Sequence, residues 1–184
     1  MHAPQAAYEW ADGCVELDAF CVSVAVGSDP AEAAAGFAAD LSTQRRARFG
    51  DGWGISQSSF GNDVVQIDVL GDAVVCVEPN GWAGIDEDRA ARLSRAGPYA
   101  ALYRSVNADM ELVLARAGRL VRRFDPLLYD SDGAIPEEEG LAFGIAGKPV
   151  SASLALIERL TGVRLSRDWL LDLERSTFLR DPDA

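Results

Sequence analysis

Histidine is almost absent from this chain: among its 184 residues the only one is His2. A Ser-His-Asp triad, a Cys-His pair and a histidine-based zinc site all need imidazole within the folded part of a protein, and the first residues of a chain tend to fray. These sites are therefore excluded as ordinary interpretations. The sequence predicts no metal site and no cofactor, and it favours a protein without enzymatic activity.

Lysine is equally scarce, with Lys148 alone against sixteen arginines. The acidic residues outnumber both, and the formal net charge is −12. Such a field repels phosphate backbones, which excludes non-specific binding to nucleic acid. The same field attracts molecules of opposite charge. The partner we expect is therefore another protein, and the charge favours a basic one.

Cysteine is scarce too, and long apolar runs are missing. Cys14, Cys21 and Cys76 are odd in number and have no CxxC spacing, which is typical of reduced thiols in a cytosolic protein. The opening "MHAPQAAYEW" lacks the apolar stretch of a signal peptide. No run approaches the length of a membrane span. We therefore expect a cytoplasmic protein that does not bind a membrane, and the oligomeric state is left open.

The chain does contain many short segments with strand periodicity. "FCVSVAV" (20–26) alternates as a half-buried strand does. "VVQIDVLGDAVVCVE" (64–78) predicts a hairpin that turns at Gly71-Asp72, with Ile67 opposite Cys76. Three further antiparallel strands are predicted over 99–106, 110–118 and 119–124.

Helical signals lie between and after these strands. Asp29 and Pro30 predict a helix start, and the following alanines carry the helix to about Leu41. The glycine- and arginine-rich residues 42–62 predict a long connection. Further helices are predicted over 85–97, over 151–163 and after Ser166. Residues 1–184 thus predict a single α+β domain, with residues 1–7 and 181–184 flexible. The expected core is an antiparallel sheet of about five to six strands, with helices on one face.

The segment "VEPNGWAGI" contains the most distinctive candidate site. Pro79 cannot donate to a sheet ladder, and Asn80-Gly81 tolerates a reversal of the chain. Trp82 then follows the turn. A tryptophan usually buries most of its large area, so the favoured interpretation is that Trp82 folds back as a lid on the core. In the alternative interpretation Trp82 anchors a partner or ligand, with Glu78 and Asn80 beside it.

Two other places have candidate residues. Arg45, Arg46 and Arg48 form a basic cluster that could clamp a phosphate or a carboxylate, although solvated side chains or internal ion pairs are the favoured interpretation. Asn107 lies between two predicted strands, where its side chain is expected to bond to the turn backbone. A small-ligand sensor or hydrolase-like enzyme is the rival function. Its site would lie near Glu78, Asn80, Trp82 and Asn107.

Three segments resemble an uncharacterised domain-of-unknown-function family of actinobacteria. They are "VEPNGWAGIDEDRAARLSRAG", "YRSVNADMELVLARAGRLVRRFDPL" and "ALIERLTGVRL". The resemblance extends from Tyr8 to Leu165. The chain departs from the family pattern at two places. Ser105 stands before Val-Asn-Ala where the family has Asn, and Ala117-Gly118 stands where the family hairpin has Asp-Gly. The resemblance implies a soluble bacterial protein with no assigned activity. The residues themselves favour a non-enzymatic acidic domain that binds another protein, such as an immunity-like neutraliser or a regulatory subunit.

Overall fold

The computed structural model describes residues 4–58 and 63–180, which fold around one sheet of antiparallel strands. The strands are β1 (Phe20–Val26), β2 (Ala39–Ala47), β3 (Val64–Leu70), β4 (Ala73–Pro79), β5 (Tyr99–Arg104), β6 (Met110–Arg116), β7 (Arg119–Phe124) and β8 (Arg175–Arg180). The α-helices are α1 (Pro30–Gly36), α2 (Phe49–Ser58), α3 (Glu87–Leu93), α4 (Pro149–Thr161) and α5 (Arg167–Leu171). The 3-10 helices are η1 (Gln5–Ala11), η2 (Val15–Leu17), η3 (Ala83–Ile85) and η4 (Pro136–Glu138).

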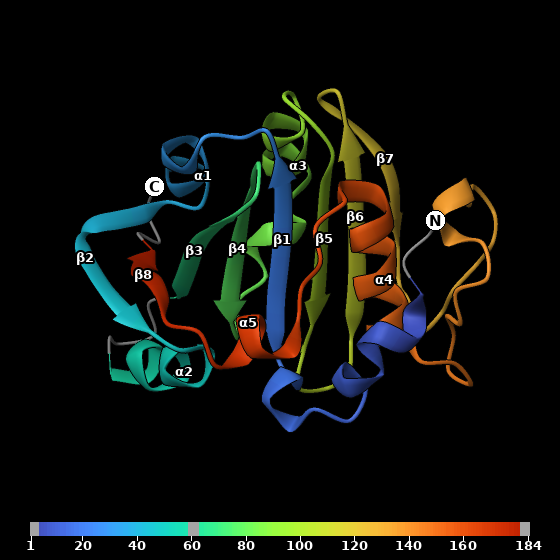
Figure 1. The fold of residues 1–184 in the computed structure, drawn as a ribbon, viewed down its shortest axis with the longest axis horizontal. Helices are drawn as coiled ribbons and strands as arrows, with labels where there is room; N and C mark the ends of the chain where they lie inside the picture. The colour runs from blue at the N-terminus through green and yellow to red at the C-terminus, as the bar shows by residue number, and fades with distance from the viewer. Residues whose placement is uncertain (1–3, 59–62, 181–184) are drawn as a thin grey trace.

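The eight strands lie in the order β2-β8-β3-β4-β1-β5-β6-β7 (Figure 1). The predicted α+β class and the antiparallel sheet are confirmed, with eight strands in place of the five or six expected. The hairpins follow the prediction closely. Ile67 pairs with Cys76, and the chain turns at Gly71, whose φ is +64°. The turn between β6 and β7 uses Ala117 and Gly118, both at positive φ.

Helices cover both faces of the sheet, so the prediction of a single covered face was wrong. Phe20 and Val22 of β1 pack in one hydrophobic core with α4, whereas Cys21 packs in a second core with α3. Figure 1 accordingly shows α4 in front of the sheet and α3 behind it. The unbroken apolar run Val74–Val77 was the signal for this arrangement, because a strand buried on both faces does not need to alternate.

The region predicted as a helix followed by a long loop has a different structure. Helix α1 ends at Gly36, well before Leu41, and Ala38 leaves the helix with a positive φ of 53°. Most of the predicted connection, 42–62, is the end of edge strand β2 and helix α2, while residues 59–62 lie outside the described residues. Strand β2 forms because β8 offers it a ladder, a tertiary effect that local propensity does not contain.

Strand β8 has no counterpart in the prediction, which placed only helices at that end of the chain. It lies between β2 and β3 and carries two arginines into the molecule. Arg175 is fully buried, stacks 4.6 Å from the Trp169 ring and donates to the Leu170 carbonyl over 2.5 Å. Arg180 reaches the interior from the other end of the strand.

Residues at the chain ends were predicted to be flexible. Residues 1–3 and 181–184 lie outside the described residues. Gln5 belongs to η1 and donates to the Lys148 carbonyl over 3.2 Å and to the Ser151 hydroxyl over 3.0 Å. Of the helices that the structure describes, none combines the length and the apolar character that crossing a membrane requires.

Candidate functional site

Glu78 is the carboxylate at the centre of a buried polar network, and it lies at the end of β4. Its side chain is on the face of the sheet that α3 covers, and the residue is only 1 % exposed. Because Asn80 adopts a positive φ of 63°, the chain reverses and η3 lies over that face. One oxygen of Glu78 accepts from the Ala83 N–H over 3.0 Å, and the other from the Gly84 N–H over 2.8 Å. The carboxylate therefore holds the turn.

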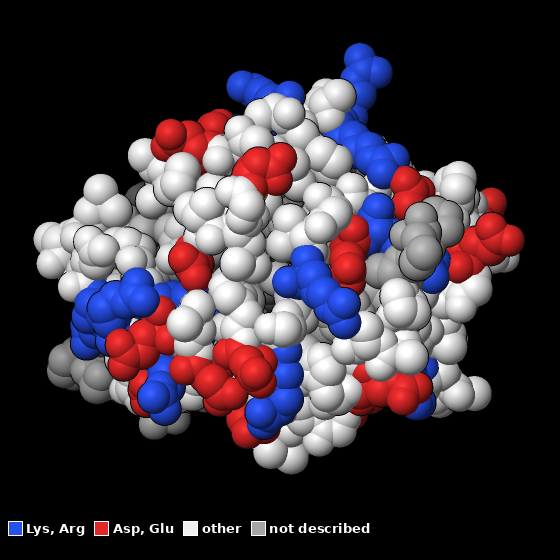
Figure 2. Space-filling view, in the orientation of Figure 1, with Lys and Arg blue, Asp and Glu red and all other residues white. Residues whose placement is uncertain are grey.

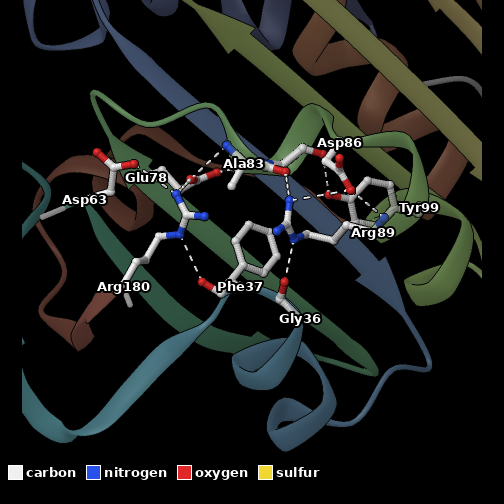
Figure 3. A network of polar contacts seen from close by, with 10 residues as sticks. Gly36, Phe37, Asp63, Glu78, Ala83, Asp86, Arg89, Tyr99 and Arg180 are labelled. Atoms are coloured by element: carbon white, nitrogen blue, oxygen red, sulfur yellow. Dashed lines mark hydrogen bonds and ion pairs between the residues drawn. The ribbon is translucent and has the colours of Figure 1, made fainter. Parts of the chain in front are cut away.

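Two arginines enclose this turn from opposite sides (Figure 3). Arg180 of β8 lies 3.6 Å from Glu78 and 3.0 Å from Asp63, and it donates to the Phe37 carbonyl. Arg89 of α3 donates to the carbonyls of Gly36 and Ala83 and stacks over the Phe37 ring. Both guanidinium groups are mostly buried, so the network joins α1, α3 and β8 to the turn.

The glycines of "EPNGWAG" are required by the close packing around this turn. A Cβ on Gly81 would lie 2.6 Å from the Glu78 Cβ, and one on Gly84 would lie 2.7 Å from the Cys21 sulfur. The Tyr99 hydroxyl also donates to the Gly84 carbonyl over 2.6 Å. The backbone of the turn is therefore fixed by contacts on both sides.

Burial dominates the acid–base properties of the groups in this network. Desolvation raises the pKa of Glu78, and the neighbouring Arg180 and the two backbone N–H groups oppose that rise. Desolvation and the nearby Glu78 carboxylate both raise the pKa of Cys21 and of Cys76. The two thiols are therefore protonated near neutral pH, which makes them poor nucleophiles.

The raised pKa of Glu78 predicts a pH dependence of stability. A carboxyl whose pKa is higher in the folded state stabilises most below the unfolded pKa, about 4.3, and loses that contribution as pH rises through the folded pKa. The difference in unfolding free energy between wild type and Glu78→Gln should therefore shift in favour of Gln as the pH rises from about 4 toward neutral. Urea melts across this range measure it. A shift in favour of wild type would contradict the raised pKa.

Trp82 lies on the outside of the turn, so the prediction that it covers the core was wrong. Its side chain is 62 % exposed. The core that it was expected to cover is instead closed by Ala83 and Ile85, which are 5 % and 7 % exposed. Because these two residues and Gly84 face the sheet, Trp82 is left facing solvent.

Carboxylates surround this exposed indole. Trp82 and Ile85 line a hollow of about 300 Å³ together with Asp86, Glu87 and Asp88 at the start of α3. Asp86 caps the helix by accepting from the Arg89 N–H over 2.8 Å. The hollow also contains one cation, the half-exposed Arg123, which pairs with Glu87 at 2.6 Å. We call this hollow the Trp82 surface.

The structure brings together only part of the residue set that the sequence suggested. Glu78, Asn80 and Trp82 share one turn, but the Glu78 carboxylate is buried while the other two residues are exposed. Asn107 lies in the exposed turn between β5 and β6, and its side chain makes no hydrogen bond within the described part of the chain. The Ser105 hydroxyl accepts from the Asn107 N–H instead. The expected side-chain bond of Asn107 was therefore wrong.

The basic cluster lies elsewhere on the molecule. Arg45 and Arg46 belong to edge strand β2 and Arg48 follows it, with β8 and β3 between them and the strand that carries Glu78. All three are exposed, and Arg46 donates to the Glu174 carbonyl. Figure 2 shows basic and acidic side chains intermixed over the region of β2 and α2. The cluster is therefore not part of the Trp82 surface.

Several residues of the site were not singled out from the sequence. Arg180 ends strand β8, which was not predicted, and Asp63 follows the segment 42–62, which was predicted as a connection. No local pattern could therefore connect either residue with Glu78. Asp86, Glu87 and Asp88 lie at the start of the helix predicted over 85–97, where acidic residues are favourable for the helix itself and so do not indicate a site. The detectable signal was a tryptophan followed within six positions by three carboxylates in "WAGIDED".

Comparisons with known proteins identify relatives without assigning an activity. The model of a family described as a family of unknown function (DUF6461) matches residues 2–179. No curated protein and no solved structure matches the chain. Within residues 4–58 and 63–180, no three His, Cys, Asp or Glu side chains are placed to hold a metal ion.

Proposed function

Because the chain belongs to DUF6461, a family of unknown function that covers nearly its whole length, we propose a function from its own surface. The proposal is a non-enzymatic, acidic protein-binding domain that takes a basic segment of a partner protein on the Trp82 surface. Examples of such a domain are an immunity-like protein that neutralises a toxin by binding it and a regulatory protein that binds its target. The observation that carries the proposal is the 62 % exposure of Trp82, although Gly81, Ala83 and Gly84 on either side of it are buried.

The rigidity of the turn supports a binding role for Trp82. Exposed tryptophans are frequent hot spots at interfaces, because a large ring ordered in advance loses little entropy on binding. Here the ring follows Gly81, which is buried against Glu78, and precedes two N–H groups that the same carboxylate holds. A partner therefore meets an indole whose backbone is already ordered.

The charges around Trp82 favour a basic partner. An arginine guanidinium can stack on an indole while it pairs with carboxylates. Asp86, Glu87 and Asp88 line the same hollow as the ring, and all three are exposed. The net charge of −12 adds a long-range attraction for basic molecules.

The contacts of the buried reactive groups favour binding over catalysis. Each oxygen of Glu78 accepts a backbone hydrogen bond, and the residue is 1 % exposed, so the carboxylate is committed to the turn. Cys21 and Cys76 are buried, with raised pKa values. These groups account for the structure of the turn without a substrate.

Selection from a displayed library of random short peptides tests this function. Peptides retained by the wild-type protein should be rich in arginine and lysine, because the surface offers an indole and three carboxylates. Trp82→Ala should fail to retain them. Val106→Ala, which alters another exposed apolar residue, should retain them and serves as the control. Retained peptides without basic residues, or equal retention by Trp82→Ala, would contradict the proposal.

A further inference from the structure

The Trp82 surface continues into a second hollow. This middle hollow, of about 280 Å³, is lined by Asp86 and Asp88 on one side and by Ala35 and Gly36 of α1 on the other. Because Asp86 and Asp88 also line the Trp82 surface, the two hollows share a wall. The two hollows are therefore adjacent at the start of α3.

A third and larger hollow lies on the far side of Ala35. It measures about 540 Å³, within the range of ligand sites in proteins. Ile67 of β3 and Phe178 of β8 line it from the sheet, and Leu41 of edge strand β2 lines it while remaining 65 % exposed. Its lining is mostly apolar, so we call it the apolar hollow.

The apolar hollow remains open because α1 lines it with alanines. Ala31, Ala34 and Ala35 are spaced as neighbours on one helix face, and each has only a methyl group. Larger side chains at these positions would occupy the space above β3 and β8. Ala35 is also a residue that the middle and apolar hollows share, so the two hollows lie next to each other at α1.

The middle hollow has more arginines than its neighbours, because Arg89, Arg92 and Arg180 line it beside Asp86 and Asp88. Arg89 and Arg180 are held by backbone carbonyls and carboxylates of the buried network. The exposed Arg92 side chain makes no hydrogen bond or ion pair with any residue in the described ranges. It is therefore available to a carboxylate of a bound molecule.

We propose that the three hollows form one docking groove for an extended peptide segment whose side chains follow the order basic, acidic, apolar. The basic group stacks on Trp82, the acidic group pairs with Arg92, and the apolar group enters the apolar hollow. This rests on the proposed function, since Trp82 receives the basic end. The occupant follows from charge complementarity at two successive hollows and from their continuity with the third.

The probes for this groove are the displayed peptides that wild type retains and Trp82→Ala loses, synthesised singly and titrated by calorimetry. Ala31→Leu combined with Ala35→Leu fills the apolar hollow, and Arg92→Glu reverses the charge of the middle one. Ala142→Leu adds the same side chain at an exposed position outside the groove and is the matched control. Thermal melts establish that each variant is folded.

If the groove exists, the retained peptides should share side chains in the order basic, acidic, apolar. Each groove variant should weaken their binding at least about tenfold, and Ala142→Leu should leave it unchanged. Trp82-dependent peptides that bind both groove variants with wild-type affinity would overturn the groove and leave the proposed function standing. If no retained peptide depends on Trp82, the proposed function falls and the groove falls with it.

Discussion

Replacing Glu78 with alanine is expected to destabilise the fold by about 3–5 kcal/mol, the scale for removing one member of a buried ion pair. The carboxylate accepts from the Ala83 and Gly84 N–H groups and faces Arg180 at 3.6 Å. Alanine leaves both donors buried without a partner, and each such donor contributes a loss of about 1–3 kcal/mol. Urea unfolding of the two proteins at neutral pH measures the difference.

The matched control for this prediction is Glu174→Ala, which removes an exposed carboxylate. It should change the unfolding free energy by no more than about 0.5 kcal/mol, as surface substitutions usually do. If Glu78→Ala behaved like the control, the carboxylate would not hold the turn. Trp82 would then have no rigid support.

Trp82→Ala is expected to separate binding from stability. Because the side chain is 62 % exposed, its removal should lower the unfolding free energy by about 1 kcal/mol or less. Affinity for a selected basic peptide should fall by about 2 kcal/mol or more, which is roughly thirtyfold in the dissociation constant. Urea melts and calorimetric titration provide the two values.

Val106→Ala is the control for Trp82, since Val106 is similarly exposed, at 66 %, and lies outside the Trp82 surface. It should change neither stability nor affinity appreciably. A loss of about 3–5 kcal/mol in Trp82→Ala would be the result expected of a core residue. That outcome would remove the basis for a binding surface at this turn.

The hairpins could be predicted from the sequence because their signals are local. In the pair β3–β4, the turn at Gly71 and the two β-branched runs are neighbours in the chain, and the pairing of Ile67 with Cys76 follows from them. Strand β8 could not be predicted in this way. Its Thr177 bonds to Gln66, 111 positions away, and only the folded sheet brings the two together.

Only part of the candidate site could be predicted from the sequence, for a related reason. The turn at Asn80-Gly81 could be located, but the direction in which Trp82 points depends on what fills the space beneath it. Glu78 and the small residues Ala83 and Gly84 fill that space through hydrogen bonds that composition does not reveal. The general preference of tryptophan for burial therefore predicted wrongly that Trp82 faces the core.

The central claim is that a partner's basic segment binds on Trp82, and NMR of the four tryptophan indole N–H groups tests it most directly. During titration with a selected arginine-containing peptide, the Trp82 signal should shift progressively and saturate. The chemical shifts of Trp10 and Trp169 should not change, because both residues are partly buried against the core that contains α4. A peptide that binds while the Trp82 signal remains fixed would contradict the account.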